Sequence, residues 1–330
     1  MYLLLPSIDT AHSITDIFLT ISRLTKKWNI DNISRTNAYF HFFQAYPELE
    51  WSFLASMVSR NAGYNMCDLE GAPLKDTLSP RYRNYLFLTY EKANYLIFKD
   101  VFPQLLLYHY STILNEKMFH YLPHFFVTAF MEREWERFWE HGDRKRLMTA
   151  LIINEQNVIQ KPVVENPFFQ QKVFQSKLFL LQDALRMNAV LFPTMNGELY
   201  GLPVHHFRNL QERIQLGKGL ADILFDYQLF PKFHQFAFLT EHTGSRMDYE
   251  QYFPVRKRRD TPFLRVVYPI IQHPDYVLEQ WDHSRKVRRK WFSQLKLPNE
   301  VNMTRLHKKK RHQLKRFSYL YRFMNDAGTH

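Results

Sequence analysis

Large apolar residues recur at intervals of three and four along most of this 330-residue chain, which is the spacing of one buried helix face. One example is the stripe of Met131, Trp135 and Trp139, with Glu132, Glu134 and Glu136 expected outside it. Only 9 glycines are present, well below the roughly 7% of an average chain, which disfavours folds built from many tight hairpins. We therefore predict an all-α fold, a multi-helix bundle of ten or more helices with one or two short irregular or extended segments.

Capping residues and prolines place the helix boundaries. The predicted helices cover about 12–28, 31–46, a segment starting at 47, then 80–99, 167–190 and 205–242. Ser79-Pro80 and Asn166-Pro167 each begin a helix, because Ser and Asn cap helix starts and proline suits the first turn. Pro103 is expected to interrupt the region that follows residue 99.

Two segments lack the helical pattern. Residues 191–203 contain two prolines, two glycines and an asparagine, which predicts a loop or small hairpin and a possible subdomain boundary. Residues 252–274 contain four prolines and predict an irregular region with short extended pieces, such as 264–268.

Composition and motifs exclude several classes of protein. A single cysteine, Cys67, cannot form an intrachain disulfide. No window approaches the roughly 18 uncharged apolar residues of a spanning helix, and the N-terminal apolar run is too short for a signal peptide. The sequence has no Walker A motif, no HExxH, no paired-cysteine motif and no Gly-x-Ser-x-Gly motif. We predict a soluble cytoplasmic protein with no metal and no cofactor.

The positive charge of the chain is confined to its last 75 residues. Residues 256–330 contain 19 Lys and Arg against 6 Asp and Glu, a net charge of +13. Residues 1–255 contain 25 basic and 26 acidic residues, a net charge of −1. This predicts a near-neutral helical body, 1–255, and a basic, mostly helical C-terminal region, 256–330, packed on the body or extending from it.

Apolar spacing after Pro274 predicts two amphipathic basic helices. The first has the apolar residues Val277, Leu278, Trp281, Trp291 and Leu295, and the second has Leu306, Leu314, Phe317, Tyr321 and Met324. Their cations, the candidate anion-binding residues, are Arg285, Lys286, Arg288, Arg289, Lys290, Lys308, Lys309, Lys310, Arg311, Lys315 and Arg316.

Three interpretations of these helices stay open. Cations interleaved with aromatic rings suit nucleic acid, where they neutralise phosphates and stack on unpaired bases. The same pattern suits peripheral association with an anionic membrane surface. The helices can also be ordinary docked helices whose solvated faces are basic. The segregation of charge favours a binding role, and nucleic acid is the partner we predict first.

The first polar motif of the body is 59–70. Arg60, Asn61, Asn65 and Asp68 would lie at the end of the helix that starts near Pro47 and in the loop beyond it. One interpretation is a helix C-cap, with Gly63 or Asn61 in the left-handed conformation and Arg60 complementing the helix dipole. The other is a polar pocket in which Arg60 binds an anion or orients Asp68.

The second polar motif is 241–250. Gly244 would end the helix that stops near His242, and Ser245 with Asp248 would cap the next one. Glu241, His242 and Arg246 are left without a structural explanation. If the two motifs converge on one concave pocket with His242 near a carboxylate, they predict a hydrolase-type enzyme as the alternative function. Its candidate catalytic residues are Arg60, Asp68, Glu241, His242, Arg246 and Asp248.

Three stretches together carry a family resemblance: 32–37, which includes Arg35, the motif 59–69 and the motif 241–250. They resemble the YppC-like family, a domain-of-unknown-function group from Bacillus-type bacteria, over roughly residues 12–260. The resemblance implies a bacterial cytoplasmic protein and carries no activity. It marks Arg35, Arg60, Asn61, Asp68, His242, Arg246 and Asp248 as the positions to test.

Overall fold

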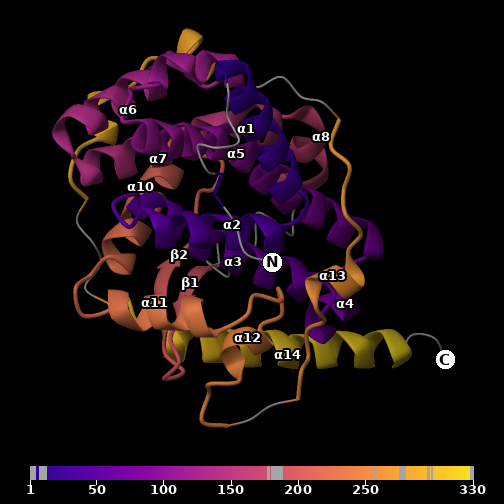
Figure 1. Ribbon diagram of the computed structural model, residues 1–330. Helices are drawn as coiled ribbons and strands as arrows, with labels where there is room; N and C mark the ends of the chain where they lie inside the picture. The colour runs from indigo at the N-terminus through magenta and orange to yellow at the C-terminus, as the bar shows by residue number, and fades with distance from the viewer. Residues whose placement is uncertain are drawn as a thin grey trace.

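The computed structural model describes residues 5–6, 13–176, 179, 189–255, 258–274, 280–295, 298 and 300–327, the last eight of these without their side chains. The described residues contain more than ten helices and one two-stranded antiparallel sheet, so the prediction of an all-α bundle is confirmed. Figure 1 shows the helices packed around one another, with the hairpin near the lower part of the body.

The elements of the first part of the chain are α1 (Ile14–Trp28), α2 (Asn32–Ala45), α3 (Glu50–Leu69), α4 (Ala72–Thr77), α5 (Pro80–Leu114), η2 (Phe119–Phe125), α6 (Ala129–His141), α7 (Arg144–Val158), η3 (Gln160–Val164), α8 (Pro167–Phe169) and η4 (Gln170–Phe174). Those of the second part are β1 (Ala189–Pro193), β2 (Leu199–Pro203), α10 (Leu210–Leu224), α11 (Phe230–Leu239), α12 (Met247–Glu250), α13 (Leu264–Val267), η5 (Trp281–His283), η6 (Arg289–Trp291) and α14 (Thr304–Ala327).

The predicted helix starts at Asp31 and Ser79 are confirmed because they depend on local hydrogen bonds, whereas the helix predicted to begin at Pro47 begins at Glu50. The side chain of Asp31 accepts a hydrogen bond from the Ser34 backbone N–H at 2.7 Å, and Ser79 caps α5 in the same way. Asn166 also caps a helix, but α8 is only three residues long and passes into a π-helical turn. The prediction of a single long helix over 167–190 is therefore wrong for residues 167–176. Residues 180–188 lie outside the described residues.

Pro103 does not interrupt a helix, contrary to the prediction. It lies inside α5, which runs unbroken for 35 residues. Proline removes one backbone donor from a helix and its ring crowds the preceding turn. Around it, Phe102, Leu105 and Leu106 are fully buried, and this packing offsets the lost hydrogen bond.

The hairpin predicted over 191–203 is confirmed. In it, β1 pairs antiparallel with β2, with Leu191 opposite Gly201 and Phe192 opposite Tyr200. Phe192 and Leu199 are completely buried. The buried residues of α1–α7, the hairpin, α10–α12 and the C-terminal region form one continuous hydrophobic cluster. The hairpin is thus part of the core on which the other helices pack.

The described residues of 258–303, here called the strap, wrap around the outside of the body (Figure 1). The Tyr268 ring stacks on Phe87 at 3.8 Å, the Trp281 indole donates to Asn154 Oδ1 at 2.8 Å, and Trp291 is buried. The strap contains short helical turns instead of the predicted elements. Residues 264–267 form α13 and not an extended piece, and 280–295 contain η5 and η6 and not one amphipathic helix. Val277 and Leu278 of that predicted helix lie outside the described residues.

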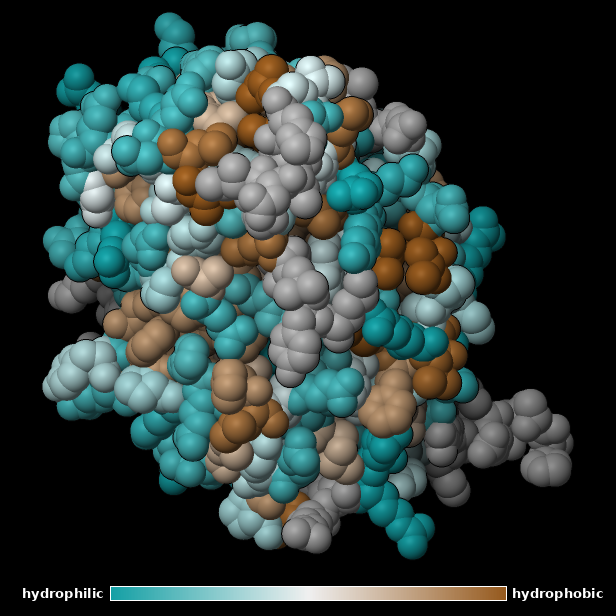
Figure 2. Space-filling view, in the orientation of Figure 1, coloured by the Kyte–Doolittle hydropathy of each residue, from teal (hydrophilic) through white to brown (hydrophobic). Residues whose placement is uncertain are grey.

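The second predicted basic helix is confirmed as α14. It begins after Met303, whose backbone N–H donates to the Leu199 carbonyl at 2.8 Å, and it packs against α4. Figure 1 shows α14 crossing the lower end of the body, with its C-terminal part projecting past α4. On the face shown in Figure 2, hydrophobic residues lie in patches separated by hydrophilic ones.

A polar network lies inside the apolar core. Both Gln104 and Asn154 donate a side-chain hydrogen bond to the Asp100 carboxyl, at 2.7 and 2.5 Å. Each of them also accepts an indole N–H at 2.8 Å, from Trp135 and Trp281 respectively. No cation among the described residues pairs with Asp100. Burial raises the pKa of Asp100 to about 7, although the two amide hydrogen bonds act in the opposite direction.

The raised pKa of Asp100 predicts a pH dependence of stability. The unfolded carboxyl loses its proton near pH 4 and the folded one near pH 7, so this group's contribution to stability falls as the pH rises through that window. Asp100→Asn removes the titration. We compare the free energy of unfolding of the variant with that of the wild type by urea unfolding. When the pH is raised from about 5 to about 8, this difference should shift by about 2 kcal/mol in favour of the variant. A pH-independent difference between the two proteins would contradict this.

Candidate functional site

The two polar motifs meet in the structure, as the enzyme hypothesis requires. Asp68 lies on the last turn of α3, and Arg246 lies immediately before α12. The Arg246 Nε donates to Asp68 Oδ1, which joins the motifs across 178 residues of sequence. Arg246 is 2% exposed, so this contact is made in the interior.

Arg246 is the centre of an ion-pair cluster made of Arg246, Asp68, Glu250, Asp260, Arg311 and Lys315. Its Nη1 donates to Glu250 Oε1 at 2.5 Å and its Nη2 donates to Asp260 Oδ1 at 2.7 Å. Burial alone would disfavour the guanidinium charge, but the three carboxylates raise the pKa of Arg246. The planar five-donor group of arginine is suited to bind several carboxylates at once.

Helix α14 supplies the remaining cations of the cluster. The Arg311 Nη1 donates to Asp68 Oδ2 at 3.2 Å, and the Lys315 Nζ lies 2.9 Å from Asp260 Oδ2. Burial acts to raise the pKa of Asp260, yet the surrounding cations lower it overall. Three carboxylates therefore face three cations, and the charges of the cluster balance.

His242 belongs to a second network, between α2, α3 and the loop after α11. The Asn32 amide donates to the Ser59 carbonyl at 2.8 Å, so Asn32 Oδ1 is the acceptor that faces His242 Nε2 at 2.9 Å. The His242 Nδ1 lies 3.4 Å from Asp248 Oδ2, which also accepts the Thr243 backbone N–H. Burial lowers the pKa of His242, with the nearby Asp248 carboxylate acting in the opposite direction.

A histidine beside a carboxylate is a common general-base arrangement, but here both ring nitrogens face protein groups. The side chains of His242 and Asp248 are 0% and 5% exposed. A substrate cannot contact either group while the surrounding side chains stay in place. The contact between the two motifs meets one part of what the hydrolase hypothesis requires, whereas the buried histidine is closed to a substrate, and that hypothesis stays a prediction.

Gly63 does not end a helix, and neither does Asn61. The C-cap interpretation is wrong because α3 continues to Leu69. A glycine is needed at position 63 because the His242 network occupies the space that a side chain would need. A Cβ on Gly63 would lie 2.8 Å from the His242 ring and also against Asn32 Oδ1. A glycine inside a helix costs stability, and here it permits the close approach of His242.

Gly244 is left-handed, with φ of +81°, but it is not the C-cap of α11, which ends at Leu239. Its Cβ position would meet Leu264 and Cys67, so it serves a close approach of chain segments. The predicted Ser245–Asp248 cap is also wrong. Asp248 accepts hydrogen bonds from the backbone N–H and hydroxyl of Thr243 instead, at 2.9 and 2.5 Å.

Arg60 and Asn61 stabilise neighbouring elements. The Arg60 Nη1 donates to the Thr240 carbonyl at 2.8 Å, at the C-terminal end of α11, where a cation complements the helix dipole. Arg60 therefore complements the dipole of α11 and not that of its own helix, and no hydrogen bond connects it to Asp68. The Asn61 side chain accepts the Leu191 N–H at 3.0 Å and donates to the Ala189 carbonyl at 3.4 Å, which fixes the edge of β1.

The other candidate residues have separate surroundings. Arg35 forms a buried ion pair with Glu91 on α5. Burial raises the pKa of Tyr90 to about 12, and a hydrogen bond with Asn65 acts in the opposite direction. Glu241 is exposed and does not join the ion-pair cluster.

The candidate anion-binding residues divide into two groups on different parts of the molecule. Arg285 pairs with Glu165 at 2.9 Å, in the part of the strap that crosses near α6 and α7. The exposed residues of the same part are Lys286, Arg288, Arg289 and Lys290. The second group lies on α14, at the other end of the body (Figure 1). The residues of this group are Lys308, Lys309, Lys310, Arg311, Lys315 and Arg316.

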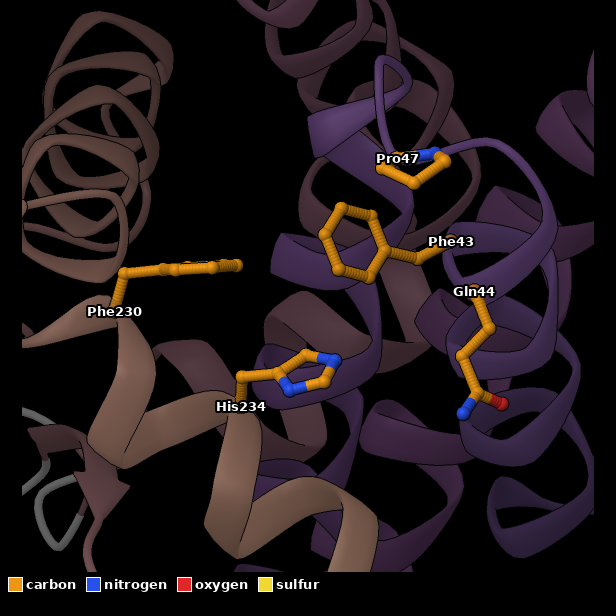
Figure 3. A pocket seen from close by; sticks show the side chains of 5 residues that line it. All are labelled: Phe43, Gln44, Pro47, Phe230 and His234. Carbon is orange, nitrogen blue, oxygen red and sulfur yellow. The ribbon is translucent and has the colours of Figure 1, made fainter.

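The structure also has a pocket away from both motifs. It has a volume of about 330 Å³ and lies between the α2–α3 connection and α11. Its lining residues are Phe43, Gln44, Pro47, Phe230 and His234 (Figure 3). Burial lowers the pKa of His234. The pocket contains none of the candidate catalytic residues.

A metal-binding cluster and a membrane-spanning helix are both absent from the described residues. In the described ranges, no three or more His, Cys, Asp or Glu side chains are grouped as a metal site would need. Among the same residues, no helix is both long and apolar enough to span a membrane.

Sequence reasoning missed three residues that the structure makes important. Asp260 and Glu250 complete the ion-pair cluster, and Arg305 is an exposed cation of α14. The i, i+4 spacing of Arg246 and Glu250 was a usable signal. Asp260 gave no signal, because its partners are distant in the sequence.

The chain belongs to a family of proteins of unknown function, DUF2515, whose model matches residues 27–313. It is 44% identical over 307 residues to the uncharacterized protein YppC of Bacillus subtilis (strain 168), an alignment that covers 92% of this chain and 95% of that protein. No solved structure matches this chain. The resemblance to the YppC-like family is confirmed, and the matched region extends into α14.

The close approach of His242 to Gly63 predicts that Gly63→Ala destabilises the protein, although helix propensity alone predicts that it stabilises it. On propensity alone, Gly63→Ala would stabilise α3 by roughly 0.5–1 kcal/mol. Because the new methyl would contact His242 and Asn32, we expect it to destabilise the protein by about 1–3 kcal/mol, measured by urea unfolding.

A double-mutant cycle identifies the cause. In a His242→Ala background, the cost of Gly63→Ala should be smaller, because the ring that the methyl would contact is gone. An equal cost in both backgrounds would rule out the histidine contact as the reason for the glycine.

The ion-pair cluster predicts that Arg246 is essential for stability. Arg246→Leu leaves Asp68, Glu250 and Asp260 with only two cations from α14, and we expect a loss of about 3–5 kcal/mol. Thermal and urea unfolding measure the loss. Arg265→Leu is the control: its side chain is 55% exposed, and it too lies 2.7 Å from a carboxylate, Asp31. The control should lose far less, because exposed pairs contribute about 0–1 kcal/mol.

Proposed function

We propose that this protein binds nucleic acid through the outer face of α14. The observation that supports the proposal is a stripe of exposed cations, Arg305, Lys309 and Arg316, at i, i+4 and i+11. These positions follow one face of a helix, with axial separations of about 6 Å between Arg305 and Lys309 and about 10 Å between Lys309 and Arg316. A row of cations at this spacing suits the regularly spaced phosphates of a nucleic-acid backbone.

The two faces of α14 have different electrostatic surroundings. Arg311 and Lys315, on the inner face, are paired with Asp68 and Asp260 of the body. The outer cations make no ion pair with any of the described residues. The sequence has no acidic residue between Glu300 and Asp326, so the outer face has no carboxylate of its own helix to compete with a phosphate.

The position of α14 leaves its outer face accessible. The helix crosses one end of the body and projects past α4 (Figure 1), and Arg305, Lys309 and Arg316 are exposed on it. The basic part of the strap lies elsewhere, so the two groups of cations do not form one continuous surface. We assign the proposed binding to α14 because its exposed cations lie along one face of a single helix.

The membrane alternative is less well supported by the same helix. An interfacial helix inserts its apolar face among the lipids. Leu314 of α14 is partly buried against the body, and the exposed Leu306 and Phe317, at 40% and 58%, lie eleven residues apart, which gives only a small exposed apolar surface. Insertion of the side that carries Leu314 would need α14 to leave the body and break its ion pairs with Asp68 and Asp260.

The proposal predicts that charge at α14, and not total charge, sets the affinity. In Arg305→Gln/Lys309→Gln/Arg316→Gln, three phosphate contacts are lost, so the slope of log affinity against log salt should fall by about 2–3. Fluorescence anisotropy with labelled nucleic acid over a salt series measures both the affinity and the slope. Circular dichroism checks that the exposed substitutions leave the fold intact.

The matched control is Lys286→Gln/Arg288→Gln/Arg289→Gln, which removes the same charge from the exposed part of the strap. It should bind nearly as tightly as wild type. Absence of binding by the wild-type protein at low salt would refute the proposal, and so would equal losses in the two triple variants. Binding to anionic vesicles in preference to nucleic acid would favour the membrane alternative instead.

A further inference from the structure

We infer that α14 binds single-stranded nucleic acid, with an unpaired base stacked on Tyr319. The inference rests on the proposed function and names the class of nucleic acid. Tyr319 is 72% exposed. It makes no hydrogen bond and no ring contact with any part of the chain that the structure describes. The cations beside this ring can bind phosphates, but phosphate binding gives no role to the ring itself.

The helix places rings and cations alternately on one face. His312, Arg316 and Tyr319 are exposed and lie at i, i+4 and i+7, so they follow one another along the same side of α14. With a rise of about 1.5 Å per residue, the two rings lie on the order of 10 Å apart along the axis, and Arg316 lies between them. Arg305 and Lys309 extend the row of cations toward the start of the helix.

This alternation fits a single strand better than a duplex. Every unpaired base has two open faces, and stacking on an aromatic side chain is worth about 1–3 kcal/mol per base. In a duplex the bases are stacked on each other, so a ring on a helix surface has no base face to cover. The cations would bind the phosphates of either form, whereas Tyr319 would contribute only to the binding of unpaired bases.

The test uses the full chain with short labelled oligothymidylate, oligouridylate and a duplex DNA of equal length, in fluorescence anisotropy at one low salt concentration. Tyr319→Ala should weaken binding to both single strands at least about fivefold and leave duplex binding unchanged. Tyr319→Phe keeps the ring and should bind like wild type. Tyr227→Ala is the control, since Tyr227 is 81% exposed but lies between α10 and α11.

A second readout separates stacking from charge. Tyr319 carries no charge, so Tyr319→Ala should lower the affinity without changing the salt slope, whereas the loss of outer cations changes the slope. If the duplex binds as tightly as the single strands, or if Tyr319→Ala has no effect, the inference fails while nucleic-acid binding stands. If none of the three probes binds, the proposed function itself fails.

Discussion

The buried guanidinium of Arg246 is the interaction on which the arrangement of the rest depends. A charge taken out of water is costly unless carboxylates surround it, and Asp68, Glu250 and Asp260 do so from α3, α12 and the strap. Each carboxylate must then be held in place by its own segment. The Arg246 guanidinium therefore places three demands on the fold. Helix α3 must continue to Asp68, the strap must return past α12, and α14 must supply further cations.

Sequence reasoning predicted those features of the fold that depend on neighbouring residues. The caps at Asp31 and Ser79 and the hairpin near 191–203 are local, and each is confirmed. The features that it missed depend on distant partners. Pro103 is tolerated because the helix around it is buried, and the strap is irregular because Trp281 and Trp291 are held by the body and not by a helix of their own.

The candidate site shows the same division. The sequence identified both polar motifs and the possibility that they converge, and the contact between Asp68 and Arg246 fulfils it. It could not show that the convergence is closed to solvent, because that depends on the packing of α2 and α14 over the motifs. Counting charges had a similar limit. It located the basic region correctly, but some of its cations neutralise carboxylates of the body and are not available to a partner.

The ion-pair cluster also has a consequence for the order of assembly during synthesis. Asp68 precedes Arg246 by 178 residues and Arg311 by 243. At about 5–20 residues per second, Asp68 waits on the order of ten to forty seconds for its first partner and longer for its second. The nascent body therefore has an excess of negative charge at this place until α14 emerges. The cluster can be completed only after Arg311 and Lys315 have been synthesised, when it joins α14 to the end of α3.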